Sequence, residues 1–390
     1  MNRDPGHFSG RVETIVVGAG VIGLTLADEL LRSGRQVLLL ERERPGSGAT
    51  WAAGGMLAPV SEADHGEAEL VRFGQDSLSR YPAFVERLEG YTGLSCGYVT
   101  EGTLWIAVNR DDRAELDHLR ETLVRKRLEC RALSAAEVVQ REPHLSGRVL
   151  GGLLVEQDHQ VDPRALSLCL EQAIRSRGGK IVCGAVVMEI VASDGRFHSV
   201  RGRTERGERF DISADQLVLA AGAWSEREVR LPLPELGVRP VKGQLLRMRG
   251  SRLLDHVVRT PDVYLVPRRD GELLVGATME EMGYDATPTA GATMDLLRHA
   301  WEVLPGVYDL ELSELSVGLR SAVDDHLPLI GQSKIEGLFL SLGHFRNGVL
   351  LAPASAYYLT RCMNDGRPPE ELRPFLPQRR ESAGATEGGS

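Results

Sequence analysis

Cysteines are few in this sequence and form no pattern. Five are spread over 390 residues. No two of them are close enough to form a CxxC pair, so we expect neither a zinc ribbon nor a dithiol redox motif. The ten histidines are also dispersed without metal-ligand spacing, and we expect no metal site. Scattered, reduced thiols are typical of a cytoplasmic protein.

Long apolar runs and an excess of positive charge are also missing. No segment approaches the ~20 apolar residues that cross a bilayer, and the N-terminal "MNRDPGHFSGRVE" lacks the pattern of a secretory signal. The formal net charge of −9 disfavours nucleic-acid binding. We therefore expect a cytoplasmic protein without nucleic-acid or membrane partners. Both ends are mostly polar, so we expect residues 1–11 and 374–390 to be disordered tails.

The segment that begins at "ETIVVGAGVIG" carries the strongest pattern. "TIVVG" predicts a buried strand, and Gly18, Gly20 and Gly23 follow in GxGxxG spacing before a helix pattern. "QVLLL" predicts a second buried strand that ends at Glu41. In such a unit the glycines permit a tight turn, a close approach of backbone to a pyrophosphate and close packing of helix on strand, while the acid bonds ribose hydroxyls. The segment therefore predicts a dinucleotide site.

The next stretch favours a large flat cofactor. "PGSGATWAAGGMLAP", residues 45–59, is rich in small residues and nearly uncharged, whereas a nicotinamide dehydrogenase would usually continue into another βα unit. A plain flexible loop is the alternative, but Met56, Leu57 and Pro59 are too apolar for one. Trp51 is large for these surroundings, and it either stacks near the cofactor or only fills space.

The order of strand and helix patterns takes the chain twice between two domains. Buried strands that alternate with helices predict a Rossmann-like domain, and alternating strands with hairpin turns predict an antiparallel sheet. The fold class is therefore α/β (α+β), with the two domains interwoven. We expect the nucleotide-binding domain at 12–94, 152–236 and 315–365, and the substrate-binding domain at 95–151 and 237–314.

Four stretches of the sequence resemble the D-amino-acid oxidase superfamily of FAD-dependent oxidoreductases, and within it the glycine oxidases of thiamine biosynthesis. They are "VVGAGVIG…LLLE", "AAGGMLAP", "YLVPR…LLVGATME" and "GLRS…GHFRNGVLLAP". The resemblance extends from residue 13 to about residue 363. It implies non-covalent FAD, a small amino-acid substrate and dioxygen as the oxidant. It also implies a homo-oligomer as large as a tetramer.

The resemblance implies a particular reaction. Hydride would pass from the α-carbon of glycine, sarcosine or a small D-amino acid to the flavin. The products would be an imine or 2-oxo acid, ammonia and hydrogen peroxide. In thiamine synthesis the glycine imine itself would supply the thiazole.

Cofactor contacts follow from the same resemblance. The pyrophosphate is expected at Val21 and Ile22, and the adenosine at Glu41, Arg42 and Val186. The other positions expected along the cofactor are Gly18, Gly20, Gly23, Ala49, Thr50, Gly54, Gly55, Met56, His344, Phe345, Arg346, Asn347, Gly348, Val349 and Leu350. Backbone N–H groups and the start of a helix in the last stretch would favour the anionic reduced flavin.

Four residues are expected at the substrate. The resemblance implies that Arg320 binds the carboxylate, that Tyr264 and Met279 line the pocket, and that Arg346 lies at the entrance. A guanidinium binds a carboxylate through two hydrogen bonds and so orients the α-hydrogen without a protein base. The alternatives are a surface cation, core packing for Tyr264 and Met279, and an inter-domain salt bridge for Arg346. The family often has proline after the arginine, and Ser321 here could shift specificity.

Three other functions stay open. A sarcosine or other small-amine oxidase would use the same site, but covalent flavin attachment would need a cysteine, and residues 315–361 contain none. A quinone-linked D-amino-acid dehydrogenase would need an apolar surface that faces a membrane. A flavin-binding subunit without turnover is disfavoured by the presence of Arg320 and Tyr264.

Overall fold

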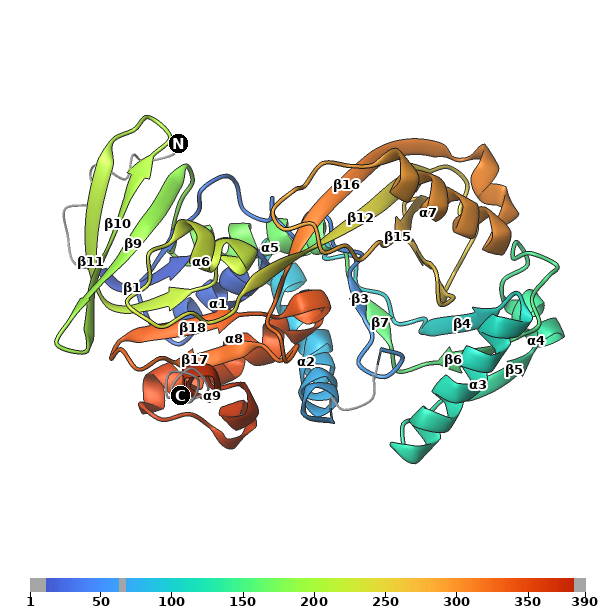
Figure 1. Ribbon diagram of the computed structural model, residues 1–390, viewed down its shortest axis with the longest axis horizontal. Coiled ribbons are helices and arrows are strands. Elements are labelled where there is room, and N and C mark those ends of the chain that lie inside the picture. Colours follow the sequence, from blue (N-terminus) through green and yellow to red (C-terminus); the bar gives the residue numbers. More distant parts are fainter. Residues whose placement is uncertain (1–11, 63–67, 382–390) are drawn as a thin grey trace, which may run out of the picture.

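The computed structural model describes residues 12–62 and 68–381, and the expectations for residues 1–11 and 382–390 lie outside this part. Two large sheets dominate the described chain, one on the left and one on the right of Figure 1. A third, two-stranded sheet joins β3 (Met56–Leu57) to β7 (His159–Gln160).

The first sheet contains the dinucleotide pattern at its centre. Its main path runs β17-β18-β11-β1-β2-β8, and β11 also pairs with β10, which pairs with β9. Its strands are β1 (Val12–Val17), β2 (Val37–Leu40), β8 (Lys180–Val182), β9 (Ala185–Ser193), β10 (Arg196–Thr204), β11 (Arg209–Leu219), β17 (Leu329–Gln332) and β18 (Leu338–Leu342). Its helical elements are α1 (Val21–Arg32), α2 (Ala68–Thr92), α5 (Pro163–Ser176), η2 (Gly222–Trp224), α6 (Ser225–Glu228), η4 (Phe345–Asn347), α8 (Gly348–Asp365), η5 (Glu370–Phe375) and α9 (Gln378–Glu381).

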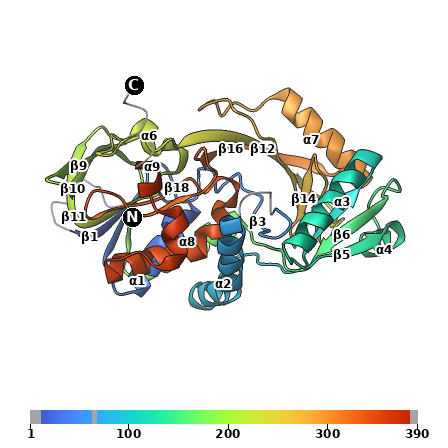
Figure 2. The same ribbon diagram turned by 60° about the horizontal axis from the view of Figure 1, so that its bottom comes forward.

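The side chains of β1 and β2 are buried on both faces of this sheet, as is usual for parallel strands that are covered on both sides. Val16 and Leu39 face a core that includes α1, α2, α5 and α8, and Figure 2 shows α1, α8 and α2 gathered on one side. Ile15 and Leu38 face the opposite core, which includes strands β9 and β10. The alternation explains why the buried residues of these short strands are apolar, with the exception of Thr14 in β1.

The second sheet is mostly antiparallel and runs β16-β12-β15-β14-β13-β4-β6-β5. Its strands are β4 (Thr103–Ala107), β5 (Arg131–Ser134), β6 (Gly151–Val155), β12 (Arg239–Arg249), β13 (Val257–Arg259), β14 (Tyr264–Pro267), β15 (Glu272–Gly276) and β16 (Glu311–Ala322). Helices α3 (Arg110–Arg125), α4 (Ala135–Arg141) and α7 (Ala290–Val303) and the turn η3 (Pro305–Asp309) accompany it. The expected fold class, a Rossmann-like domain interwoven with an antiparallel sheet, is confirmed.

Two expected boundaries differ from the structure. Strand β16 pairs with β12 from Glu311 to Ala322, so residues 315–322 lie in the second sheet, because a continuous ladder has no break at residue 315. The C-terminal segment was expected to be disordered from residue 374. Instead Phe375 is buried with its ring 4.7 Å from that of Phe73, and apolar burial holds this end against the first core.

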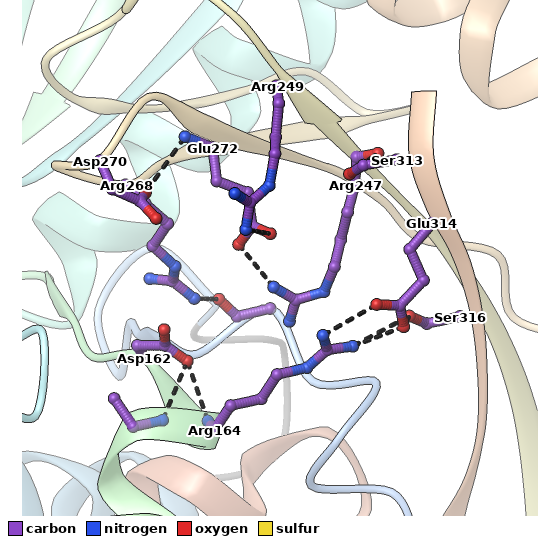
Figure 3. Close-up of polar contacts among 12 residues, drawn as sticks. Asp162, Arg164, Arg247, Arg249, Arg268, Asp270, Glu272, Ser313, Glu314 and Ser316 are labelled. Atoms are coloured by element: carbon purple, nitrogen blue, oxygen red, sulfur yellow. Dashed lines mark hydrogen bonds and ion pairs between the residues drawn. The ribbon is translucent and has the colours of Figure 1, made fainter. Parts of the chain in front are cut away.

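Charged side chains join the two sheets (Figure 3). Arg164 of α5 donates to both carboxylate oxygens of Glu314 in β16, at 2.9 and 2.6 Å. The hydrogen bond from Arg164 is the main cause that lowers the pKa of Glu314 to about 2. Trp51 donates its indole N–H to the same carboxylate at 3.1 Å, and Arg268 donates to the carbonyl oxygen of Gly54 at 2.7 Å. The glycine-rich segment is therefore fixed to the second sheet at two points.

Neither membrane spans nor metal clusters are seen in the described part of the chain. None of its helices is both long and apolar enough to pass through a membrane. No group of three or more His, Cys, Asp or Glu residues within it could hold a metal ion.

Candidate functional site

A cavity of about 470 Å³ lies where the two sheets meet. Its walls come from the turn after β1, the segment 47–56, the start of β9, and the ends of β15, β16 and β18. Of the residues expected at a cofactor or substrate, Gly23, Asn347 and Leu350 are not among those that line it, and all the others are. The sequence pattern thus converges on one place.

Two glycines of the turn lie so close to neighbouring backbone that no side chain would fit. Gly18 has φ +101°, and a Cβ there would lie 2.5 Å from the carbonyl oxygen of Ala220. A Cβ on Gly23 would lie 1.9 Å from the carbonyl oxygen of Gly18, so Gly23 serves the packing of α1 rather than the cavity wall. Gly20 begins α1 without a side-chain cap, and the first turn contains no acidic residue. The N–H of Val21 donates to the hydroxyl of Thr50 at 3.0 Å, so the following N–H groups of that turn are the ones suited to bind a pyrophosphate.

Glu41 lies at the end of β2 with its carboxylate held by backbone. One oxygen accepts from the N–H of Ala19 at 2.7 Å and the other from the N–H of Glu43 at 2.9 Å. Burial raises the pKa of Glu41, and these two hydrogen bonds partly offset the effect. A carboxylate fixed in this way can accept further hydrogen bonds from ribose hydroxyls, which is the chemistry that the sequence pattern predicts.

The part of the cavity lined by Arg42 has an aromatic wall, which the sequence reasoning missed. The guanidinium of Arg42 lies 4.1 Å from the ring centroid of Trp224 and bonds Glu228 at 2.9 Å. Trp224 and Glu228 both line the cavity, as does Val186. The stretch "AAGAW" after a buried strand is the signal that could have indicated this wall.

At the part of the cavity where the flavin is expected, the loop after β18 enters α8. Gly343 and Phe345 have φ +73° and +47°, and this sharp path brings residues 343–349 to the cavity. His344 is buried, and its Nε2 lies 3.2 Å from the hydroxyl of Ser355. Burial lowers the pKa of His344 to about 3, so the imidazole is neutral at physiological pH. Helix α8 begins at Gly348 without a side-chain cap from Asn347, which leaves its positive end directed at this loop.

Arg320 lies near the end of β16 over a glycine. Its Nη1 donates to the carbonyl oxygens of Thr278 at 3.1 Å and Lys242 at 3.4 Å. A Cβ on Gly243 would lie 2.4 Å from the same Nη1, so the guanidinium packs directly against the backbone of this glycine. The remaining N–H groups of Arg320 have no partner that is seen within residues 12–62 and 68–381, and they are available to a carboxylate in the cavity.

Tyr264 is held between two glycines. A Cβ on Gly276 would lie 2.6 Å from the tyrosine ring, and one on Gly54 would lie 3.1 Å from it. Burial raises the pKa of Tyr264, so the phenol stays protonated and can donate a hydrogen bond. The sequence reasoning identified Tyr264 but not Gly243 or Gly276, because the contacts join different strands.

The other substrate-side residues lie at the mouth. Met279 lines the cavity but is 69% exposed, so it forms a rim. Arg346 also lines the cavity, and its Nε lies 3.8 Å from a carboxylate oxygen of Glu62. Ser321 accepts a hydrogen bond from the N–H of Gly343 at 3.2 Å, which connects strand β16 to the loop before α8.

Trp51 does not line the cavity. Its indole packs 3.6 Å from the guanidinium of Arg164, so it stabilises the contact between the sheets. Stacking near the cofactor was the alternative, and the described contacts do not include it.

Known proteins resemble the chain over most of its length. The family model described as DAO, FAD dependent oxidoreductase, matches residues 13–362. A glycine oxidase from Pseudomonas aeruginosa is 34% identical over 371 residues, which are 93% of this chain and 98% of that protein. The crystal structure of glycine oxidase from Geobacillus kaustophilus has a TM-score of 0.85 and 29% identity, with 94% of this chain and 98% of that chain covered.

A two-part relative is matched over only part of its length. The bifunctional protein ThiO/ThiG of Trichormus variabilis is 35% identical over 349 residues, which are 88% of this chain. The chain spans about half of that relative, 51% of its length. Since the glycine turn, the buried acid and the uncapped helix starts fit FAD, and since the family model matches most of the chain, this protein belongs to the FAD dependent oxidoreductases of the DAO family.

Proposed function

We propose that the chain is an oxidase of glycine that also accepts sarcosine and small D-amino acids. The observation that carries the proposal is Arg320, a cation that lines the same cavity as Tyr264 and donates to the carbonyl oxygen of Thr278. The likeness to glycine oxidases supports the substrate class. The likeness to ThiO/ThiG supports a role in supplying glycine imine for the thiazole of thiamine.

Residues of this chain divide the work. The turn Gly18–Gly23 would hold the pyrophosphate of FAD, Glu41 its ribose, and residues 343–349 its ring system. When bound, FAD accepts a hydride from the α-carbon and returns the electrons to dioxygen, which leaves as hydrogen peroxide. The remaining task of the protein is to bind and orient the amino acid.

Orientation comes from Arg320 and Tyr264. Two parallel hydrogen bonds from the guanidinium would fix the plane of the substrate carboxylate, and the protonated Tyr264 would add a third from the side. With the carboxylate fixed, the α-carbon of the substrate would be held in one orientation, and the barrier would fall through positioning. Burial keeps the imidazole of His344 neutral, so His344 would add no further cation to the cavity wall.

A spectrum of the purified holoprotein tests this proposal. Glycine added without oxygen is expected to bleach the visible flavin band, and air is expected to restore the band with formation of peroxide. Bleaching by sarcosine or D-alanine but not by glycine would move the preferred substrate. Fast reoxidation by a quinone and slow reoxidation by air would favour a dehydrogenase. Failure of the protein to take up FAD would contradict the proposal as a whole.

Two further properties are proposed from the resemblance alone. We expect a homo-oligomer as large as a tetramer, and light scattering on the eluted holoprotein measures its mass. We expect the protein in the cytoplasm, which fractionation of the source cells checks.

Gly243→Ala is expected to weaken carboxylate binding without loss of FAD. The new methyl group would overlap the guanidinium of Arg320, and the arginine would have to leave its position against the carbonyl oxygen of Thr278. We expect KM for glycine to rise about tenfold or more, since a misplaced bidentate donor loses much of its binding energy. Titration of glycine under steady-state conditions measures the effect.

Gly147→Ala is the matched control. A Cβ on Gly147 meets nothing within 4 Å, so the KM of this variant for glycine should equal that of the parent protein. An unchanged KM in Gly243→Ala would show that Arg320 does not bind the carboxylate in the position seen here.

A further inference from the structure

Ionisable side chains surround the substrate end of the cavity. Of the described residues that line it near Tyr264, the ones counted as charged are Glu62, Arg259, Asp262, Arg320 and Arg346, since Tyr264 and His344 are neutral. Three guanidinium groups and two carboxylates leave one net positive charge among these described residues. Of these five side chains only Arg320 has a role in orienting the substrate, and the other four have none so far.

Glu62 is bonded to two of the arginines. One carboxylate oxygen accepts from Nη1 of Arg259, and the other lies 3.8 Å from Nε of Arg346. Nη2 of Arg346 also donates to the carbonyl oxygen of Glu62 at 3.4 Å. The side chains of Glu62 and Arg259 are only 15% and 17% exposed. Salt therefore screens this negative charge less than it screens a surface charge.

Arg259 is fixed by more than its ion pair. Its guanidinium lies 4.6 Å from the ring centroid of Trp105 and 6.0 Å from that of Tyr264. These stacking contacts and the bond to Glu62 together hold it at the wall. Because Arg259 is committed to Glu62, it is not available to bind a second anionic group of a substrate.

Asp262 adds a second carboxylate, which is more exposed to solvent than that of Glu62. It lies in the turn between β13 and β14, two residues before Tyr264, and it is exposed. Water and salt screen an exposed charge more strongly than a half-buried one. Its influence on a ligand in the cavity should have the same sign as that of Glu62 and a smaller size.

The charge count matches one kind of ligand. An amino acid ready for hydride transfer has a neutral amine and one carboxylate, so it carries a single negative charge, which one net positive charge balances. A second carboxylate would extend toward the mouth and meet Glu62 and Asp262, where like charges repel at close range, while Arg346, the cation at the mouth, is already engaged by the carboxylate and the carbonyl oxygen of Glu62. Specificity of this kind comes from an unfavourable contact with the wrong ligand.

We propose that Glu62, assisted by Asp262, is a specificity-determining residue that restricts the site to amino acids with one carboxylate and excludes those with two. The inference deepens the proposed function and rests on it for the identity of the substrate. The test of this inference does not require turnover, because the affinity of a ligand depends directly on the charge at the entrance.

Two ethers provide the test. Methoxyacetate and diglycolate have an oxygen where sarcosine and iminodiacetate have the amine, so neither can form an imine, and they differ by one carboxylate. Each is titrated into the holoprotein, and the change in the flavin spectrum gives its Kd. The measured quantity is the ratio of the Kd of diglycolate to that of methoxyacetate.

The ratio is expected to fall about tenfold in Glu62→Gln, since removal of one like charge near the ligand is worth roughly one power of ten. Asp262→Asn is expected to lower it by a smaller factor. The double variant Glu62→Gln/Arg259→Gln restores one net positive charge, and its ratio is expected to return toward that of the parent. Glu69→Gln removes an exposed carboxylate that pairs with Arg72 on α2, and the ratio should not change.

An unchanged ratio in Glu62→Gln would overturn the inference. If that variant does not retain FAD, the ratio of Asp262→Asn decides, and no fall there would also overturn it. Failure of the proposed function looks different. In that case glycine leaves the flavin of the parent protein oxidised, while the ratios still shift with charge.

Discussion

Arg320→Ala is expected to lower kcat/KM for glycine by about a thousandfold while the flavin stays bound. The substitution removes both hydrogen bonds to the carboxylate and the only orienting cation of the mechanism, and losses of this size follow when a charged bidentate contact to substrate disappears. The cofactor should remain, because its expected contacts lie in the glycine turn, Glu41 and residues 343–349. Steady-state kinetics and the visible spectrum of the variant measure the two parts separately.

Arg320→Lys separates charge from geometry. A lysine keeps the cation but loses the planar fork, and its activity should fall between those of the parent and the alanine variant. Arg373→Ala removes an exposed arginine that pairs with Glu370 and provides the control. Parent-like kcat/KM in Arg320→Ala would refute the assignment of the carboxylate site.

Asp158→Asn is expected to remove a strong pH dependence of stability. Asp158 is fully buried, and burial raises the pKa of its carboxyl from 3.8 to about 7, although hydrogen bonds to Ser61 and to the backbone of Val60 oppose the shift. The folded protein therefore holds this proton at a pH where the unfolded chain has released it. The stabilisation is complete below about pH 4 and is lost as the pH rises toward 7.

The size of the effect follows from the shift. A difference of about three pKa units corresponds to about 4 kcal/mol as an upper limit. Asparagine does not ionise, so the variant should gain stability relative to the parent between pH 5 and 8. Urea unfolding of both proteins across this range, at one fixed concentration of FAD because bound ligand shifts the midpoint, measures the difference.

Asp309→Asn supplies the control, since Asp309 is exposed. Its stability should follow that of the parent at every pH. If the stability of the parent and that of Asp158→Asn changed with pH in parallel, the buried carboxyl would not hold its proton in the folded state.

Sequence patterns predicted the features that depend on neighbouring residues. The turn at Gly18, the helix that begins after Gly20 and the acid at Glu41 are local, because each follows from backbone geometry within one strand–helix–strand unit. The same holds for the buried strands of the first sheet, whose apolar runs are short and continuous. These local features also located the cavity.

Contacts between distant segments had no such signal. Arg346 and Glu62 are separated by 284 residues along the chain, and Trp51 and Glu314 by 263. The glycine beneath Arg320 is on another strand, and nothing in "VKGQLL" indicates that its Cα supports a guanidinium. The end of the second sheet at Ala322 was missed for a related reason, since pairing with β12 rather than composition sets it.

The interwoven topology has a consequence for protein synthesis. Strand β1 emerges first from the ribosome, but its neighbour β11 is made about two hundred residues later, and β18 completes that side of the sheet only near the C-terminus. Helix α8, which covers α1 and α2, follows later still. The nascent chain therefore exposes the apolar face of α1 until α8 has been made, so the first core cannot be completed while its early segments leave the ribosome.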